Sequence, residues 1–257
     1  MRAVTISVVI PTRDRPALLA RAVASVQAQT HAPLEILVVD DGASSVAPAR
    51  ASGARVLANP RTPGPSGARN AGAAAASGDL LAFLDDDDEW LPSYLATAAA
   101  EIAAARLDVL CTDLLYRYDD GSERPGKPAA ARLVADDFLT HNPGLIGSNL
   151  IIRRALYTAV DGFDESLAAA EDMDFGLRLS LLDGVRYAPL HQRLVRHHQH
   201  TRPRLCMRRG DAMRAGIRRF FALHGGRMSA GQRAQFADSV RKLWGFDEFG
   251  RDCETAP

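Results

Sequence analysis

Short apolar runs alternate with helical patterns along the first third of the chain. Ile6–Ile10 is a β-branched run that stops at Pro11, and the apolar positions within Leu18–Val26 then recur at helical spacing. Leu34–Val39 and Leu80–Leu84 are two more apolar runs of strand length. Runs of this length predict buried strands. Strands that alternate with helices predict a mainly parallel sheet in a three-layer α/β arrangement.

Weaker patterns continue to the end of the chain. Further strands are expected at Arg55–Ala58, Asp108–Tyr116, Leu145–Ile152 and Tyr187–Val195. Further helices are expected in the alanine-rich segment before Ser77 and at Pro92–Ala105, Asp172–Leu182, Leu205–Leu223 and Arg233–Trp244. Asp119–Ala131, rich in glycine, proline and charge, predicts a loop.

Polar motifs follow three of the expected strands directly. They begin at Pro11, at Asp40-Asp41-Gly42 and at Asp85–Asp88. Ligands of open α/β sheets bind beyond the carboxyl ends of the strands, which is where all three motifs fall. The pattern therefore predicts one ligand site at that edge of the sheet.

Composition narrows the class of protein. A formal net charge of zero argues against a general nucleic-acid binder, and 47% hydrophobic residues argue against wholesale disorder. The widely spaced Cys111, Cys206 and Cys253 have no metal-type spacing and suit reduced thiols in the cytoplasm. Neither a spanning apolar stretch nor a signal cleavage site is evident. We expect a cytoplasmic protein that is soluble or peripheral to the inner face of a membrane.

Four consecutive aspartates, Asp85–Asp88, end the expected strand Leu80–Leu84. Carboxylates a few ångströms apart raise one another's pKa and oppose folding unless a cation compensates them. Their hard oxygen atoms suit Mn²⁺ or Mg²⁺, which complete their coordination with water and substrate phosphates. The alternative is a solvated acidic turn. Because the run ends a buried strand abruptly, we favour a divalent metal.

Six short motifs along the chain have the residue types and the order that are found in one enzyme family. They are Val8–Thr12, Val38–Gly42, Gly67–Gly72, Leu80–Trp90, Asp161–Glu165 and Glu171–Phe175. Together they resemble family 2 glycosyltransferases of the GT-A fold, over roughly residues 5–198. The resemblance implies a GT-A type three-layer α/β/α sandwich with a mainly parallel central sheet, followed by C-terminal helices. It also implies transfer of a sugar from a nucleotide diphosphate sugar, expected to be a UDP-sugar, to an acceptor with inversion.

The resemblance assigns the donor contacts of the first two strands. Pro11 would touch the nucleotide base through its main chain, with Thr12 and Asp14 as further candidate contacts, and Asp41 would hydrogen-bond the uracil. The residues alone allow simpler interpretations, in which Pro11 ends a strand and Asp40 caps a turn.

The resemblance also interprets the aspartate run and the helix before it. Asp85, Asp86 and Asp87 align with the family's Asp-x-Asp element, so Asp85 and Asp86 would contact the donor, with Asp86 facing the ribose. Asp87 would hold the metal, with the register ambiguous by one residue. Arg69 is a further candidate donor contact, although Arg69 and Asn70 could equally form a capping pair.

An inverting transferase needs a base that takes the acceptor's proton, away from the metal cluster. Asp172 lies on the apolar face of the expected helix Asp172–Leu182, whereas Asp174 pairs with Arg178 at i,i+4 and is expected to face water. The spacing leaves open whether Glu171 and Asp172 only complement the positive end of a helix. The resemblance, in which a Glu-Asp pair carries the base, implies that Asp172 is the base.

Histidines follow the expected strand Tyr187–Val195. His197, His198 and His200 lie beside arginines, and surface histidines in such places usually have no role in a site. Because histidine is the commonest transition-metal ligand, one of them could close the metal shell. We take His198 as the candidate metal ligand, with His200 as its alternative.

Other classes of protein remain in competition. A dehydrogenase would need Gly-x-Gly-x-x-Gly after the first strand, where this chain has Pro11–Pro16, and the P-loop motif is absent as well. A sugar-phosphate nucleotidyltransferase would begin with a Gly-rich basic loop. A catalytically silent sugar-nucleotide-binding protein would have lost the metal cluster or the base, and the sequence keeps candidates for both.

The expected domain organisation is one catalytic unit with an extension. Residues 1–204 would form the GT-A domain, with 1–110 binding the nucleotide sugar and 111–204 the acceptor, and 205–257 would pack on it as a helical extension. Arginines crowd between Arg193 and Arg219, either as a solvated surface or as a contact for diphosphates or anionic lipid. Expected partners are the donor and an unidentified glycan, lipid-linked glycan, peptide or natural product, but no nucleic acid. Peripheral membrane contact and a homodimer are compatible with the extension.

Overall fold

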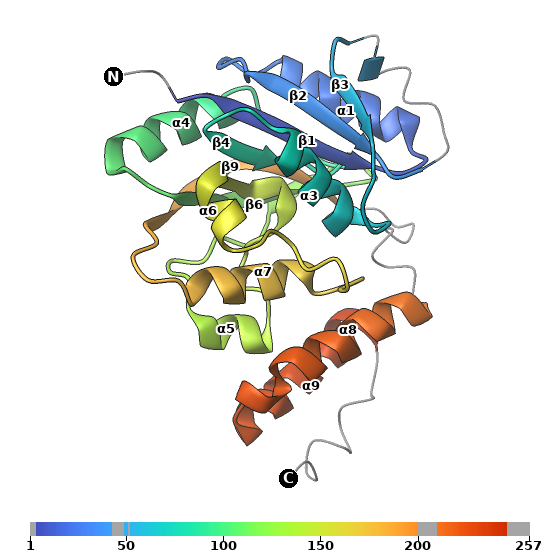
Figure 1. The fold of residues 1–257 in the computed structure, drawn as a ribbon, viewed down its shortest axis with the longest axis vertical. Coiled ribbons are helices and arrows are strands. Elements are labelled where there is room, and N and C mark those ends of the chain that lie inside the picture. Colours follow the sequence, from blue (N-terminus) through green and yellow to red (C-terminus); the bar gives the residue numbers. More distant parts are fainter. Residues whose placement is uncertain (1–3, 43–48, 51, 200–209, 246–257) are drawn as a thin grey trace.

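The computed structural model describes residues 4–42, 49–50, 52–199 and 210–245 (Figure 1). In this part of the chain the strands form one mixed sheet in the order β3-β2-β1-β4-β8-β6-β9-β5, and β7 pairs with β6. The strands are β1 Ile6–Thr12, β2 Glu35–Asp40, β3 Arg55–Ala58, β4 Leu80–Phe83, β5 Glu89–Trp90, β6 Val109–Tyr118, β7 Glu123–Pro125, β8 Leu150–Arg153 and β9 Tyr187–Gln199.

Helices cover both faces of this sheet. The α-helices are α1 Pro16–Gln27, α3 Pro65–Ala75, α4 Tyr94–Ala105, α5 Ala135–Thr140, α6 Arg154–Ala159, α7 Glu171–Ser180, α8 Asp211–His224 and α9 Ala230–Trp244. The described residues also include the 3₁₀ turns η1 Gly147–Asn149 and η3 Gly225–Arg227. Proline at the first position of α1 agrees with the expected helix start. Helix α3 also begins at a proline, Pro65, inside a segment that was expected to form a turn.

Alternating side chains of the central strands divide the core into two clusters. In β1, Val8 and Ile10 pack in one cluster with α1 and α4, while Val9 packs in the other with α3 and the helices of the second half. Leu81 and Phe83 of β4 join Val9 on that second face. Successive side chains of a strand point to opposite faces of the sheet. Because both faces are covered, the central strands are continuous apolar runs in the sequence.

Parallel pairing brings the predicted strand ends together. β1 pairs in parallel with β2 and β4, and β2 with β3, so the carboxyl ends of these strands share one edge. β8 is inserted antiparallel between β4 and β6, and β6 is again parallel to β9. The expected α/β fold, with a central sheet followed by C-terminal helices, is confirmed. Each antiparallel pair of the described strands includes β5, β7 or β8.

Several boundaries differ from the sequence expectation. The strand expected at Leu145–Ile152 begins only at Leu150, because 147–149 form the turn η1. The expected loop 119–131 contains β7, which pairs with β6. The helices α5 and α6 were not expected, since each has only 6 residues and too few positions to show a period.

The C-terminal helices α8 and α9 pack against the helices of the preceding part of the chain (Figure 1). Met213, Ile217 and Phe220 of α8 and Phe236 of α9 belong to the same core cluster as residues of the helix α7. Helix α8 begins at Asp211, and Arg202, Arg204, Arg208 and Arg209 lie outside the described residues, as does His200. In the described part of the chain, no helix is both long and apolar enough to cross a membrane.

Candidate active site

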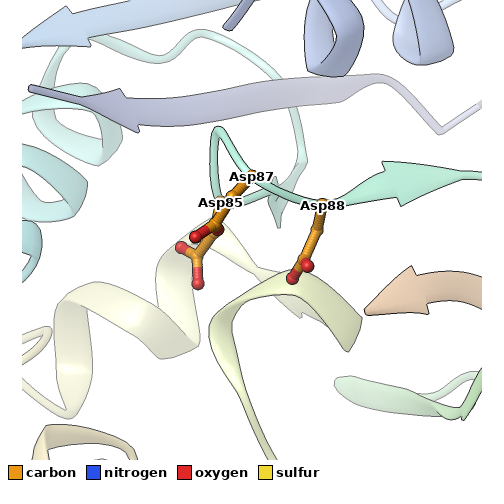
Figure 2. Close-up of side chains that lie close together, drawn as sticks. All are labelled: Asp85, Asp87 and Asp88. Carbon is orange, nitrogen blue, oxygen red and sulfur yellow. The ribbon is translucent and has the colours of Figure 1, made fainter. Parts of the chain in front are cut away.

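The turn between β4 and β5 gathers three of the four aspartates. The amide of Asp88 donates to the carbonyl of Asp85 at 3.0 Å, which closes the turn. One carboxylate oxygen each from Asp85, Asp87 and Asp88 then lie within 4.8 Å of one another. Figure 2 shows the three side chains leaving the same turn toward one side. Three hard oxygen donors at this separation fit Mg²⁺ or Mn²⁺.

Asp86 points away from this cluster and toward the end of β1. The hydroxyl of Thr12 donates to its Oδ2 at 2.6 Å, and Arg15 Nε donates to the same atom at 3.2 Å. Burial of the carboxyl raises its pKa to about 7, against the opposing effects of Arg15 and Thr12. The four successive aspartates therefore divide into three cluster residues and one that is bound to β1 and its following turn.

Arg15 is a site residue that the sequence analysis missed. Its Nη1 lies 2.9 Å from Asp87 Oδ2, and its guanidinium also forms an ion pair with Asp86. Arg21 of α1 donates to the backbone carbonyl of Asp87 at 2.9 Å. The arginines thus offset part of the repulsion between the carboxylates, which the sequence analysis expected a metal to offset. The sequence feature that could have identified Arg15 is its place in the turn after the first strand, which lies opposite the acidic run.

Asp88 is held by residues of η1 and β9. Ser148 Oγ donates to Asp88 Oδ2 at 2.6 Å, and His197 Nδ1 lies 2.9 Å from the same oxygen. The ring of His198 faces Glu89 instead, with Nε2 at 2.6 Å from its carboxylate, while the His198 amide donates to Asp88 Oδ1 at 3.0 Å. His198 therefore lies beside the cluster, and its role as a metal ligand stays a prediction. His197 is the nearer ring to an aspartate of the cluster.

Ser148 links two ends of the aspartate run and yields a stability prediction. Its fully buried hydroxyl donates to Asp88 and accepts from the amide of Asp85 at 3.1 Å. Ser148→Ala leaves both groups short of a partner, so we expect the free energy of unfolding to fall by about 1–3 kcal/mol. Chemical denaturation measures it. Ser93→Ala, at an exposed helix start without a side-chain cap, is the matched control. Equal stability of the two variants would contradict this role.

The predicted donor contacts lie together at the carboxyl edge of β1 and β2. Pro11 and Thr12 are the last residues of β1, and Asp14 follows in an exposed turn with a φ of 55°. Asp41 accepts from Asn59 Nδ2 at 2.5 Å and from the Gly64 amide at 2.8 Å, so it orders the loop before α3. Their contacts with a nucleotide stay predictions.

The turn-capping interpretation of Asp40 agrees with the structure. Its Oδ1 accepts from the amide of Gly42 at 3.0 Å.

The capping interpretation of Arg69 and Asn70 is wrong, because both side chains reach distant segments. Asn70 donates to the Phe163 carbonyl at 2.8 Å and to Glu165 at 2.9 Å.

Arg69 lies buried between the acidic cluster and the start of α7. Its Nη2 donates to Asp85 at 2.6 Å, and its Nη1 lies 3.6 Å from Glu171. The guanidinium lies under Gly147, where an added Cβ would come within 2.7 Å of Nη2. Its carbon is 5.1 Å from the centre of the Phe163 ring. Arg69 thus bridges Asp85 of the acidic cluster and Glu171 at the start of α7, a place that spacing along the chain could not show.

Asp172 lies in the first turn of α7, across Arg69 from the acidic cluster. Burial raises the pKa of Asp172 well above its usual range, and the charges of Glu171 and Asp85 raise it further, while Arg69 opposes them. Its buried Oδ1 has no hydrogen-bond partner among the described residues. A carboxyl group whose pKa is perturbed in this way is a candidate for proton transfer. Both interpretations, helix stabilisation and base, stay compatible with this position.

The environment of Asp174 corrects one expectation. It pairs with Arg178 as predicted, at 2.8 Å, but it does not face water, since it is only 2% exposed. His224 of α8 covers it, with Nε2 at 2.8 Å from Asp174 Oδ1. The expectation was wrong because His224 lies 50 residues further along the chain, beyond any helical period.

The comparisons with known proteins agree in class. The profile of glycosyl transferase family 2 matches residues 7–160. The uncharacterized glycosyltransferase YwdF of Bacillus subtilis is 32% identical over 185 residues, which cover 67% of each chain. The Escherichia coli protein WfgD, named a UDP-Glc:α-D-GlcNAc-diphosphoundecaprenol β-1,3-glucosyltransferase, is 27% identical over 156 residues, covering 59% of this chain and 61% of WfgD.

The structural comparison bears on the fold. The crystal structure of S. aureus TarS 1–349 in complex with UDP-GlcNAc superposes with a TM-score of 0.65 at 21% identity. The likeness covers 98% of this chain and 76% of that one. It confirms the expected GT-A type architecture.

Proposed function

The chain belongs to glycosyl transferase family 2, and we propose that it transfers a sugar from a UDP-sugar to an acceptor with inversion. The expected enzyme class, a glycosyltransferase, is confirmed by the family. One observation carries the proposed mechanism: a cluster of three carboxylates lies on one side of Arg69, and the start of α7, with Asp172, lies on the other. That arrangement separates a place for the diphosphate from a place for the base.

The donor would bind along the carboxyl edge of β1, β2 and β4. Pro11, Thr12 and Asp14 would line the nucleotide, with Asp41 at the base and Asp86 at the ribose. The TarS complex with UDP-GlcNAc, a protein of the same fold, supports a UDP-sugar as the donor. Asp85 and Arg69 would face the diphosphate and the sugar, since their ion pair lies where the cluster meets α7.

The metal would be held by Asp87, with Asp85 and Asp88 completing the carboxylate set and His198 as the predicted further ligand. A bound Mn²⁺ or Mg²⁺ would stabilise the negative charge on the departing diphosphate. Arg15 already pairs with Asp87 and holds its carboxylate at the turn. Ser148 holds Asp88 through the hydrogen bond from its hydroxyl group.

Asp172 would take the proton of the acceptor hydroxyl as that oxygen attacks the anomeric carbon. The bond from the anomeric carbon to the diphosphate oxygen breaks, and UDP leaves with both electrons of that bond. Attack opposite the leaving group inverts the configuration. The buried Oδ1 of Asp172 has no hydrogen-bond partner among the described residues, which supports a role for this carboxyl group in proton transfer.

The acceptor half and the extension complete the proposal. Residues 1–110 would bind the donor, 111–204 would shape the acceptor side, and 205–257 would pack on that side. The name of WfgD describes a lipid-linked acceptor, which supports the same acceptor class here. The exposed arginines Arg214 and Arg218 of α8 favour an anionic acceptor, or contact with the inner face of a membrane from the cytoplasm. A homodimer through this extension is a further proposal.

A sugar-nucleotide screen tests the proposed function. We expect at least one UDP-sugar, in the presence of Mn²⁺, to raise the melting temperature and to be hydrolysed slowly to UDP with water as the acceptor. UDP release measures the reaction. Binding without hydrolysis of any sugar nucleotide would contradict the enzyme and favour the alternative, a catalytically silent sugar-nucleotide-binding protein. Release of pyrophosphate from a nucleoside triphosphate and a sugar phosphate would favour a nucleotidyltransferase.

A further inference from the structure

Helix α8 lies in backbone contact with the segment that leads into α7. Gly216 is buried, and a Cβ added there would lie 2.5 Å from the amide nitrogen of Ala169 and 3.0 Å from backbone atoms of Ala168. Backbone atoms at that distance cannot move aside as a flexible side chain could. Ala170 follows in the left-handed region, at a φ of 62°, and α7 then begins. The close approach at Gly216 therefore places α8 directly against the segment that leads into α7.

A buried polar contact joins the two helices a second time. His224, at the end of α8, lies 2.8 Å from Asp174 and is 9% exposed. The other oxygen of Asp174 pairs with Arg178, whose Nη2 also donates to the Gly162 carbonyl at 2.7 Å. Burying such groups is costly unless each finds its partner, so the pair specifies one relative placement of α8 and α7.

These two contacts lie on either side of Asp172 in the sequence. Ala169 comes three residues before it and Asp174 two residues after it. Between them, Met213 and Ile217 of α8 share a core cluster with Met173 of α7. Helix α8 therefore holds the first turn of α7 at both ends, while the carboxyl group of Asp172 interacts electrostatically with Arg69 and with Asp85 of the acidic cluster.

We propose that α8 positions the candidate base, with Gly216 and His224 as positioning residues that act on Asp172 through the segment 168–174. The proposal rests on the proposed function of Asp172. The matched family profile ends at residue 160, so α8 adds this support from outside the matched segment. Catalysis depends on such support because a misplacement of about 1 Å can cost about 10²-fold in rate.

Gly216→Ala tests the backbone contact. We expect the turnover number for UDP-sugar hydrolysis to fall by about tenfold or more, since the added methyl group displaces α8 from Ala169. The KM for the donor and the affinity for UDP should stay unchanged, because the nucleotide contacts come from β1, β2 and β4. Gly231→Ala is the matched control, since a Cβ there meets nothing within 4 Å.

His224 variants test the polar contact. His224→Gln keeps a donor for Asp174 and should retain most of the turnover, whereas His224→Leu should lower it without changing UDP affinity. Assays at a temperature well below the melting point of each variant separate positioning from loss of folded protein. Wild-type turnover in both Gly216→Ala and His224→Leu, with only a lower melting temperature, would show that α8 is a structural cover and overturn the proposal.

Amide hydrogen exchange keeps the proposal testable apart from the proposed function. If the wild-type protein hydrolyses no sugar nucleotide, the proposed function fails. Hydrogen exchange across residues 166–176 then decides whether α8 positions the start of α7. We expect faster exchange of this segment in Gly216→Ala and wild-type exchange in Gly231→Ala. Unchanged exchange in Gly216→Ala would overturn the proposed action of α8 on α7.

Discussion

Sugar transfer by Asp172→Asn is expected to fall by about 10²–10⁴-fold, with UDP binding intact, because the amide has nearly the same shape but accepts no proton. Burial and Glu171 raise the pKa of Asp172, so it loses its proton only above the range of an ordinary aspartate. A base works only without its proton. The wild-type rate should therefore rise with pH through this raised pKa and level off above it.

Release of UDP from the donor identified in the sugar-nucleotide screen measures this effect, with water or the natural acceptor as the nucleophile. Asp183→Asn, in the exposed turn after α7, is the matched control and should keep the wild-type rate and pH profile. A rate for Asp172→Asn within about threefold of wild type would rule out Asp172 as the base.

Removal of the metal is expected to abolish most of the stabilisation that UDP gives. With Mn²⁺ or Mg²⁺ present, UDP at a hundred times its Kd should raise the free energy of unfolding by about 2.7 kcal/mol. In EDTA the diphosphate would face Asp85, Asp87 and Asp88, whose negative charges Arg15, Arg21 and Arg69 offset in part, so the gain should be much smaller. Asp87→Ala should reproduce the EDTA result with Mn²⁺ present.

Thermal unfolding with and without UDP measures the gain in each condition, and Asp183→Ala serves as the control that removes an exposed carboxylate. Equal stabilisation by UDP in EDTA would contradict a metal at this turn. An intact metal-dependent gain in Asp87→Ala would instead keep the metal and move its main ligand to Asp85 or Asp88.

The parts predicted well from the sequence are those in which neighbours along the chain determine the structure. The apolar runs Ile6–Ile10 and Leu80–Leu84 correspond to the buried strands β1 and β4, because side chains on both faces of a covered strand must be apolar. The polar motifs that follow them lie at one edge of the sheet, as parallel pairing requires. The family resemblance rests on these same segments, and the matched profile confirms it.

Contacts between distant segments could not be predicted in this way. Arg15 and Asp86 are 71 residues apart, and the partners Ser148 and His197 of Asp88 lie 60 and 109 residues away. No periodicity spans such distances. The helices α5 and α6 were missed for a related reason. Each has only 6 residues, which is too short for a periodic pattern, so packing against the surrounding core determines where they form.

The sequence by itself determined the α/β class, the strands whose ends carry the chemistry, and an acidic run suited to a metal. Only the tertiary structure decided which aspartates converge, because successive side chains in a turn leave the backbone in different directions. Asp85, Asp87 and Asp88 meet there, whereas Asp86 turns to Thr12. It also decided that Asp174 is buried under α8, since burial depends on which distant helix packs there.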